Sequence, residues 1–149
     1  MKMITFSLFI VGMLCLAAGC ANSATRYSMD PGEGVYTFAH ETTKDQASVF
    51  YLAEEWMASN ISNANEAITM RSPESGTLVA NLSKRVYVVG APFWMTYTVR
   101  VSCDENKIST RFTTGTLENG TYPPKPAMPG LEEDFRLLSL GLHKYVEDN

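Results

Sequence analysis

The clearest candidate for covalent chemistry in this chain is the thiol of Cys20. It directly follows three small residues, Ala17, Ala18 and Gly19. Small side chains before a cleavage point can enter a peptidase cleft, so cleavage after Gly19 would place this thiol on the new N-terminal residue. We interpret Cys20 as a site of covalent attachment, in which the sulfur forms a thioether, and not as a catalytic group.

The residues before this cysteine have the pattern of a secretory signal. Lys2 is the only charged residue before Arg26, and residues 3–18 form a nearly unbroken apolar run of sixteen residues. This run is too short to span a bilayer, which requires about 20 apolar residues. A positive start, an apolar middle and small residues at the end are typical of a signal peptide.

With the cysteine included, the segment resembles the bacterial lipobox. It departs from that motif in one place, because Ala17 stands where leucine is usual and Leu16 lies one position earlier. We expect residues 1–19 to be a signal peptide, Cys20 to carry the lipid anchor and residues 20–33 to form a flexible tether. The alternative is ordinary cleavage after Gly19, which leaves a secreted protein without lipid.

The charge of the expected mature chain restricts its partners. The full chain has 12 Lys and Arg against 16 Asp and Glu, and loss of Lys2 leaves 11 against 16, a net charge of −5. An acidic protein is repelled by nucleic acid, so we expect no nucleic-acid partner. Residues 34–147 have the size of one domain with one core.

No other residues form a recognisable catalytic or metal-binding pattern. His40 and His143 are far apart and have no second ligand at metal spacing. Cys103 falls on the apolar side of a predicted strand, so we expect a buried, inert thiol. A disulfide would require Cys20 to escape lipidation and meet Cys103. Hydrolase, zinc-protease, dithiol and phosphate-loop motifs are absent from the sequence, and we expect no cofactor and no metal.

Hydrophobic periodicity predicts an α+β fold with the order strand, helix, four strands, helix. The predicted strands cover residues 34–39, 67–71, 77–89, 93–103 and 108–117, and the helices begin near Thr43 and Leu131. One-sided alternation indicates an antiparallel sheet whose single apolar face is covered by both helices. The first helix is expected to bury Val49, Phe50, Ala53, Trp56 and Met57, and the last to bury Phe135, Leu138, Leu142 and Tyr145.

Two single positions qualify this pattern. Trp56 could be imagined in a ligand pocket, but an aromatic residue on the apolar stripe of a helix is more often part of the core. Lys84 lies on the apolar side of its strand, and a bulge or an edge position would explain it.

The outer face of the predicted sheet offers a candidate surface for a ligand or partner. If Val88 pairs with Phe93 across the turn at Gly90, then Tyr87 lies opposite Trp94 as an exposed aromatic pair. Such a pair suits a sugar or the edge of a partner protein.

Two arginines extend this candidate surface. If Cys103 pairs with Ile108, then Arg100 lies opposite Arg111 on the outer face. Like charges directly opposite are destabilising, so facing arginines could receive a small anion. The alternative is a solvated sheet on which neighbouring acids offset the two charges.

Three segments resemble an uncharacterised bacterial lipoprotein family, which is known by a domain of unknown function (DUF4468) with a TBP-like fold. They are residues 43–60 with Glu54-Glu55-Trp56, residues 75–79 with Ser-Gly-Thr-Leu-Val, and residues 97–103 before Asp104. The resemblance covers most of residues 34–115. It implies the same strand and helix order and a place among envelope lipoproteins of Bacteroidetes, and it supplies no catalytic residues.

Two classes of function follow from these observations. The first is a lipid-anchored binding or interaction module of the cell envelope, without catalysis, whose partner is an envelope protein or a small anionic or sugar ligand. The second is a periplasmic or surface enzyme whose site is assembled only in the fold. The absence of catalytic motifs favours the first. The fold name does not indicate DNA binding, because fold does not determine function.

Overall fold

Five antiparallel strands form a single sheet in the computed structural model, which describes residues 34–88, 90–122 and 128–149. The strand order is β1-β5-β4-β3-β2, so the first and last strands are neighbours. The α+β prediction is confirmed, and the short helix α2 is an addition to the predicted order. The elements are β1 (Val35–Glu41), α1 (Gln46–Asn60), α2 (Ala64–Ala67), β2 (Ile68–Ser72), β3 (Thr77–Val88), β4 (Ala91–Asp104), β5 (Lys107–Leu117) and α3 (Met128–Asp148).

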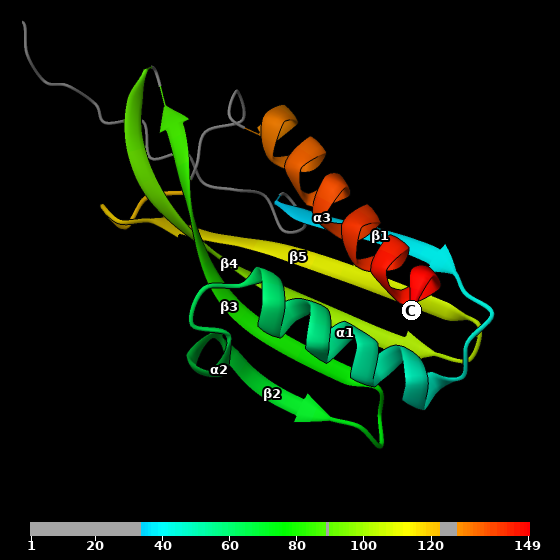
Figure 1. Cartoon of the computed structure of the whole chain (residues 1–149). Helices are drawn as coiled ribbons and strands as arrows, with labels where there is room; N and C mark the ends of the chain where they lie inside the picture. Colours follow the sequence, from blue (N-terminus) through cyan, green and yellow to red (C-terminus); the bar gives the residue numbers. More distant parts are fainter. Residues whose placement is uncertain (1–33, 89, 123–127) are drawn as a thin grey trace, which may run out of the picture.

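Both long helices lie on the same face of the sheet, as Figure 1 shows. Helix α1 packs over β3 and β4, whereas α3 packs over β1 and β5, and the two helices also contact each other. This arrangement gives the sheet one face directed at the helices and one outer face.

Alternation along β4 explains why only one face is buried. Trp94 and Arg100 are exposed on the outer face, between residues that point toward the helices. Of the six residues that alternation in the sequence directs inward, Phe93 is partly buried and the other five are buried: Met95, Tyr97, Val99, Val101 and Cys103.

An aromatic cluster forms the centre of the contact between α3 and the sheet. The ring of Phe135 is fully buried and stacks on Phe112, with centroids 4.5 Å apart and planes 7° apart. Tyr97 and Tyr36 flank it, with centroid distances to Phe135 of 5.1 Å and 5.5 Å. Stacked and tilted aromatic pairs at these distances add specific attraction to the burial of apolar surface.

Two side chains of the sheet differ from their predicted settings. Ile68 and Met70 would share one face in a regular strand over residues 67–71, but a register shift between them in β2 leaves Ile68 buried and Met70 47% exposed. Lys84 lies in an unshifted part of the β3–β4 ladder, and its ammonium group forms an ion pair with Asp134 on α3. A helix partner, not a bulge or an edge, therefore accommodates this charge.

The helix ends also differ from prediction. Helix α1 begins at Gln46, later than the predicted start near Thr43, and Asp45 caps it, because its carboxylate accepts a hydrogen bond from the Ser48 amide at 3.0 Å. Helix α3 begins at Met128, earlier than the predicted start near Leu131. Its buried positions are Leu131, Phe135, Ser139, Leu142 and Val146. The predicted Leu138 and Tyr145 are only partly covered by the protein, because the stripe runs along positions displaced by one residue.

Candidate functional site

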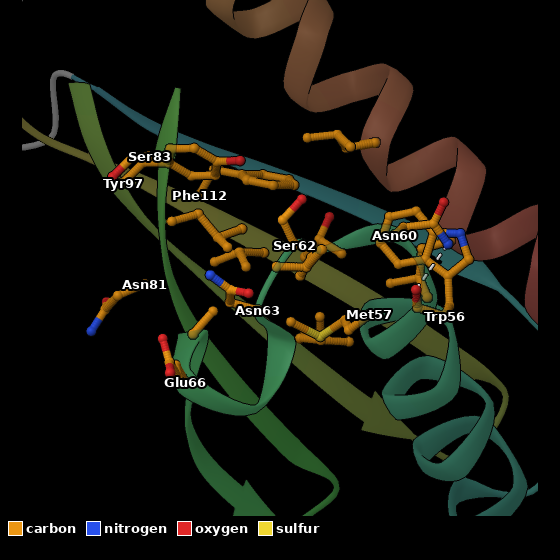
Figure 2. Close-up of a pocket in the computed structure, with 18 residues that line it drawn as sticks. Trp56, Met57, Asn60, Ser62, Asn63, Glu66, Asn81, Ser83, Tyr97 and Phe112 are labelled. Carbon is orange, nitrogen blue, oxygen red and sulfur yellow. Dashed lines mark hydrogen bonds between the residues drawn. The ribbon is translucent and has the colours of Figure 1, made fainter. Parts of the chain in front are cut away.

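The two long helices do not cover the whole inner face of the sheet, and a cavity of about 580 Å³ lies in the space they leave. Its walls are the C-terminal end of α1, the loop before α2 and the middle of α3, and its floor is formed by β3, β4 and β5. Figure 2 shows Trp56 and Asn60 at one end and Tyr97 and Phe112 at the other. A volume of this size is typical of a small-molecule site.

The interior of the cavity is apolar, and its rim is polar and almost uncharged. Asn60, Ser62 and Asn63 contribute neutral polar groups from the end of α1 and the following loop, and Glu66 is the only charged residue among the described lining residues. The apolar part of the lining comes from Trp56, Met57, Ile61, Ala67, Leu82, Tyr97, Val99, Val101, Phe112, Leu138 and Leu142. Burial raises the pKa of Tyr97, so its phenol stays neutral.

The rim is held by local hydrogen bonds that the sequence encodes. The side-chain amide of Asn60 donates to the carbonyl of Trp56 at 2.9 Å, in the last turn of α1. Asn63 has a left-handed backbone (φ 57°), which asparagine tolerates better than most residues. Its carbonyl accepts hydrogen bonds from Glu66 and Ala67 at 2.9 Å and 3.0 Å, and these bonds start α2.

Trp56 is partly buried and lines the cavity, so the expectation that it belongs to the closed core is only half right. It packs against the apolar cluster on one side and faces the cavity on the other. The backbone of α3 lies close to Trp56 at Gly141, where a Cβ would lie 3.6 Å from the indole in ordinary van der Waals contact, so the approach does not require glycine.

The predicted pairing of Tyr87 with Trp94 is wrong. Val88 pairs with Ala91, so the hairpin turn is two residues shorter than expected, and Tyr87 pairs with Pro92. Arg85 lies opposite Trp94 instead, and its guanidinium lies 5.9 Å from the centre of the Tyr87 ring. Tyr87 and Trp94 are exposed, at 64% and 54%, on the outer face. Arg85 was not predicted at this surface, although it lies two residues before Tyr87 in β3 and therefore on the same face of the sheet.

The predicted pairing of Arg100 with Arg111 is confirmed. Both side chains are exposed on the outer face, on the side of the sheet opposite to the cavity. Arg100 lies six residues along β4 from Trp94, or about 20 Å. The two arginines and the two aromatic residues are therefore separate features, and neither contributes to the cavity.

We expect the double variant Arg100→Ala, Arg111→Ala to be as stable as the unaltered protein or slightly more stable. Facing like charges repel each other, and the substitutions remove that repulsion. Urea unfolding monitored by circular dichroism measures the change. A large loss of stability would show that the pair has a structural role, and the idea of an anion site there would fail.

The fold brings together two histidines that the sequence analysis treated as unrelated. His40 on β1 and His143 on α3 stack with ring centroids 4.7 Å apart. His40 Nε2 lies 3.0 Å from Ser139 Oγ, which also accepts a hydrogen bond of 2.8 Å from the Thr110 hydroxyl. His143 Nε2 donates to the carbonyl of Glu41 at 2.9 Å. These contacts join α3 to the edge of the sheet.

This polar cluster does not have the geometry of a catalytic site. Ser139 lies within hydrogen-bonding distance of His40, but it is only 1% exposed, so a substrate cannot reach its hydroxyl. Cys103 is fully buried, and desolvation raises the pKa of its thiol to about 12. The prediction of an inert core thiol agrees with this placement.

The histidine pair gives stability a dependence on pH. Burial, and secondarily the nearby His143, lower the pKa of His40 from its ordinary value of 6.5. The unfolded chain therefore binds this proton more readily, so the contribution is complete above pH 6.5 and is lost as the pH falls through the lowered pKa. We expect His40→Gln to reduce the loss of stability between roughly pH 7.5 and pH 5, measured by urea unfolding. An unchanged pH dependence would contradict this assignment, because both proteins share the same carboxylates.

The predicted lipid attachment site lies outside the residues that the structure describes, because Cys20 belongs to residues 1–33. Within residues 34–88, 90–122 and 128–149, no group of three or more His, Cys, Asp or Glu side chains is placed to hold a metal ion. The same ranges contain no helix with the length and apolar character needed to cross a membrane.

Three solved structures show limited similarity to this chain. A DUF4468 family protein from Bacteroides ovatus has a TM-score of 0.46 at 13% identity, over 56% of this chain and 56% of that one. A TBP-like protein from Parabacteroides distasonis has a TM-score of 0.45 at 15% identity, over 57% and 56%. Ara h 8.0201 has a TM-score of 0.37 at 16% identity, over 77% and 97%. This chain thus matches just over half the length of the first two.

Comparison with curated protein sequences gives no match. A family model does match, and its description is a domain of unknown function (DUF4468) with TBP-like fold, covering residues 37–116. This range is more than half of the 149 residues and runs from within β1 through nearly all of β5. The chain therefore belongs to the DUF4468 family and has its TBP-like fold.

Proposed function

We propose that this protein is a lipid-anchored binding module of the bacterial cell envelope, without catalytic activity, and that a small molecule binds in the cavity between the helices and the sheet. The cavity carries the proposal. It joins an apolar interior to a rim of neutral polar groups, which is the usual composition of a small-molecule site. The side chains that line it are suited to binding, whereas the hydroxyl of Ser139, which contacts His40, is closed to solvent.

The N-terminal sequence supports the lipid anchor. Lys2, the apolar run over residues 3–18 and the small residues before Cys20 together favour export and lipidation. In the native host, we expect a labelled fatty acid to be incorporated into the unaltered protein and not into Cys20→Ser. Processing should also be sensitive to globomycin. An intact mass that shows a free thiol at Cys20, or a different N-terminus, would mean that the protein carries no lipid anchor at this residue.

Ligand binding can be measured with the protein's own fluorescence. The chain contains two tryptophans, and Trp94 lies on the outer face, so Trp94→Phe leaves Trp56 as the only reporter, in the cavity wall. In the full chain with Cys20→Ser, purified without detergent, we expect monomeric dodecyl maltoside to shift the Trp56 emission to the blue, because an apolar chain displaces water from the indole.

A matched pair of variants tests the location. Leu138 lines the cavity and is 37% exposed, whereas Leu137 is 54% exposed and does not line it. We expect Leu138→Phe to weaken binding at least about fivefold by filling part of the volume, and Leu137→Phe to leave it unchanged. Equal binding by the two variants would place the ligand elsewhere, and no emission change with any probe would disprove the binding site.

A further inference from the structure

The charge around the cavity mouth indicates which ligands the cavity can accept. Glu66 is exposed at the rim and is the only charged residue among the described lining residues, so no Lys or Arg lines the part of the cavity that the structure describes. Figure 2 shows Glu66 at the edge of the lining, on the same side as Asn63. A carboxylate or phosphate head is normally held by arginine, lysine or several backbone amides. No arginine or lysine side chain is present among the described lining residues to hold such a head.

The C-terminal end of α1 also favours a positively charged group at the cavity mouth. The helix ends at Asn60, which lines the mouth, and its last turn contains no basic residue. The C-terminal end of a helix carries a partial negative charge from its last carbonyl groups. One of the last four carbonyls is used, since Met57 accepts from the Ile61 amide, and the preceding carbonyl, of Trp56, accepts from the Asn60 side chain. No lysine or arginine in this last turn neutralises the partial negative charge of the other carbonyl groups.

From these two observations we propose that the natural ligand of the cavity is an amphiphile with a positively charged head. Its apolar body would lie on the floor formed by β4 and β5, against Val99, Val101 and Phe112. Its head would lie at the rim between Asn60 and Glu66. This inference rests on the proposed function and adds the chemical class of the ligand. A preference for a cationic head would also distinguish the cavity from the outer face, where Arg100 and Arg111 would favour an anion.

A pair of ligands with the same chain and opposite heads tests the proposal. With the Trp94→Phe, Cys20→Ser protein as reporter, dodecylammonium and dodecanoate are titrated near neutral pH, below their micelle concentrations. At low ionic strength we expect dodecylammonium to bind about fivefold more tightly than dodecanoate, from one charge near Glu66. This ratio should decrease in about 0.5 M salt, because exposed charges are screened.

A matched pair of acid substitutions separates the local charge from the net charge. Glu66→Gln and Glu74→Gln change the net charge equally, but Glu74 lies in the turn between β2 and β3, away from the cavity lining. We expect Glu66→Gln to reduce the ratio to about twofold or less, which leaves the contribution of the α1 terminus. Glu74→Gln should leave it unchanged.

Each contrary outcome has a distinct meaning. If dodecanoate binds as tightly as dodecylammonium, or if Glu66→Gln retains the full ratio, the cationic class is wrong while the cavity remains a binding site. If neither of these ligands nor dodecyl maltoside changes the Trp56 emission, the proposed function fails together with this inference.

Discussion

Phe135→Ala is expected to lower the free energy of unfolding by about 3–5 kcal/mol, the usual cost of removing a buried aromatic ring. The ring is fully buried and stacks on Phe112 at 4.5 Å. It also contacts the rings of Tyr97 and Tyr36, so its removal takes one ring contact away from each of three aromatic neighbours. Because the cluster joins α3 to three strands of the sheet, the void cannot close by a small movement of one side chain. Urea unfolding monitored by circular dichroism gives the value.

Leu137→Ala is the matched control for this prediction. It lies two residues away on the same helix and is 54% exposed. We expect its effect to stay within about 0.5–1 kcal/mol, as for other exposed positions. A loss below about 2 kcal/mol for Phe135→Ala would mean that the helix repacks, and the aromatic cluster would then not be the main attachment of α3.

Gly76→Ala is expected to be the most damaging substitution of a single hydrogen by a methyl group in the described part of the chain. Gly76 has φ +60°, and a Cβ there would lie 2.1 Å from the carbonyl oxygen of Cys103. That approach is required because the Cys103 amide donates to the Gly76 carbonyl at 2.8 Å. The methyl group must separate the turn from β4, so we expect a loss of about 3 kcal/mol or more from strain and the broken hydrogen bond.

Gly120→Ala separates the two causes. Gly120 also has a positive φ, +78°, but a Cβ there would meet nothing within 4 Å. Only the cost of the left-handed backbone applies, about 1–2 kcal/mol. Thermal and urea unfolding of the two variants should therefore differ clearly. Equal losses would show that the close contact at Gly76 relaxes without cost.

Local patterns predicted the elements well, and they failed where distant segments decide the outcome. The register of β4 with β5 was correct because Asp104 to Asn106 mark the turn clearly, and Asn106 has a left-handed φ of 59°. The register at the other hairpin was wrong, since Val88 and Ala91 carry no turn signal and pair as strand residues. The pattern of alternation is the same for both registers, so it could not distinguish them.

The cavity and the histidine stack could not be predicted in the same way. The cavity lies at the C-terminal end of α1, beside the middle of α3, and its volume depends on how far apart these two helices settle. The stack of His40 on His143 depends on the rotational phase of α3 relative to β1. The family resemblance, by contrast, rested on local segments, and the match over residues 37–116 confirms it.

The pairing of β1 with β5 has a consequence for how the chain is made. Val35 pairs with Thr113, so the first strand has no strand partner until β5 has been synthesised. Contacts between such distant residues carry a high entropic cost of loop closure and slow folding. In a nascent chain of this topology the hairpin of β3 and β4 can form first, and β1 completes the sheet only when β5 is available.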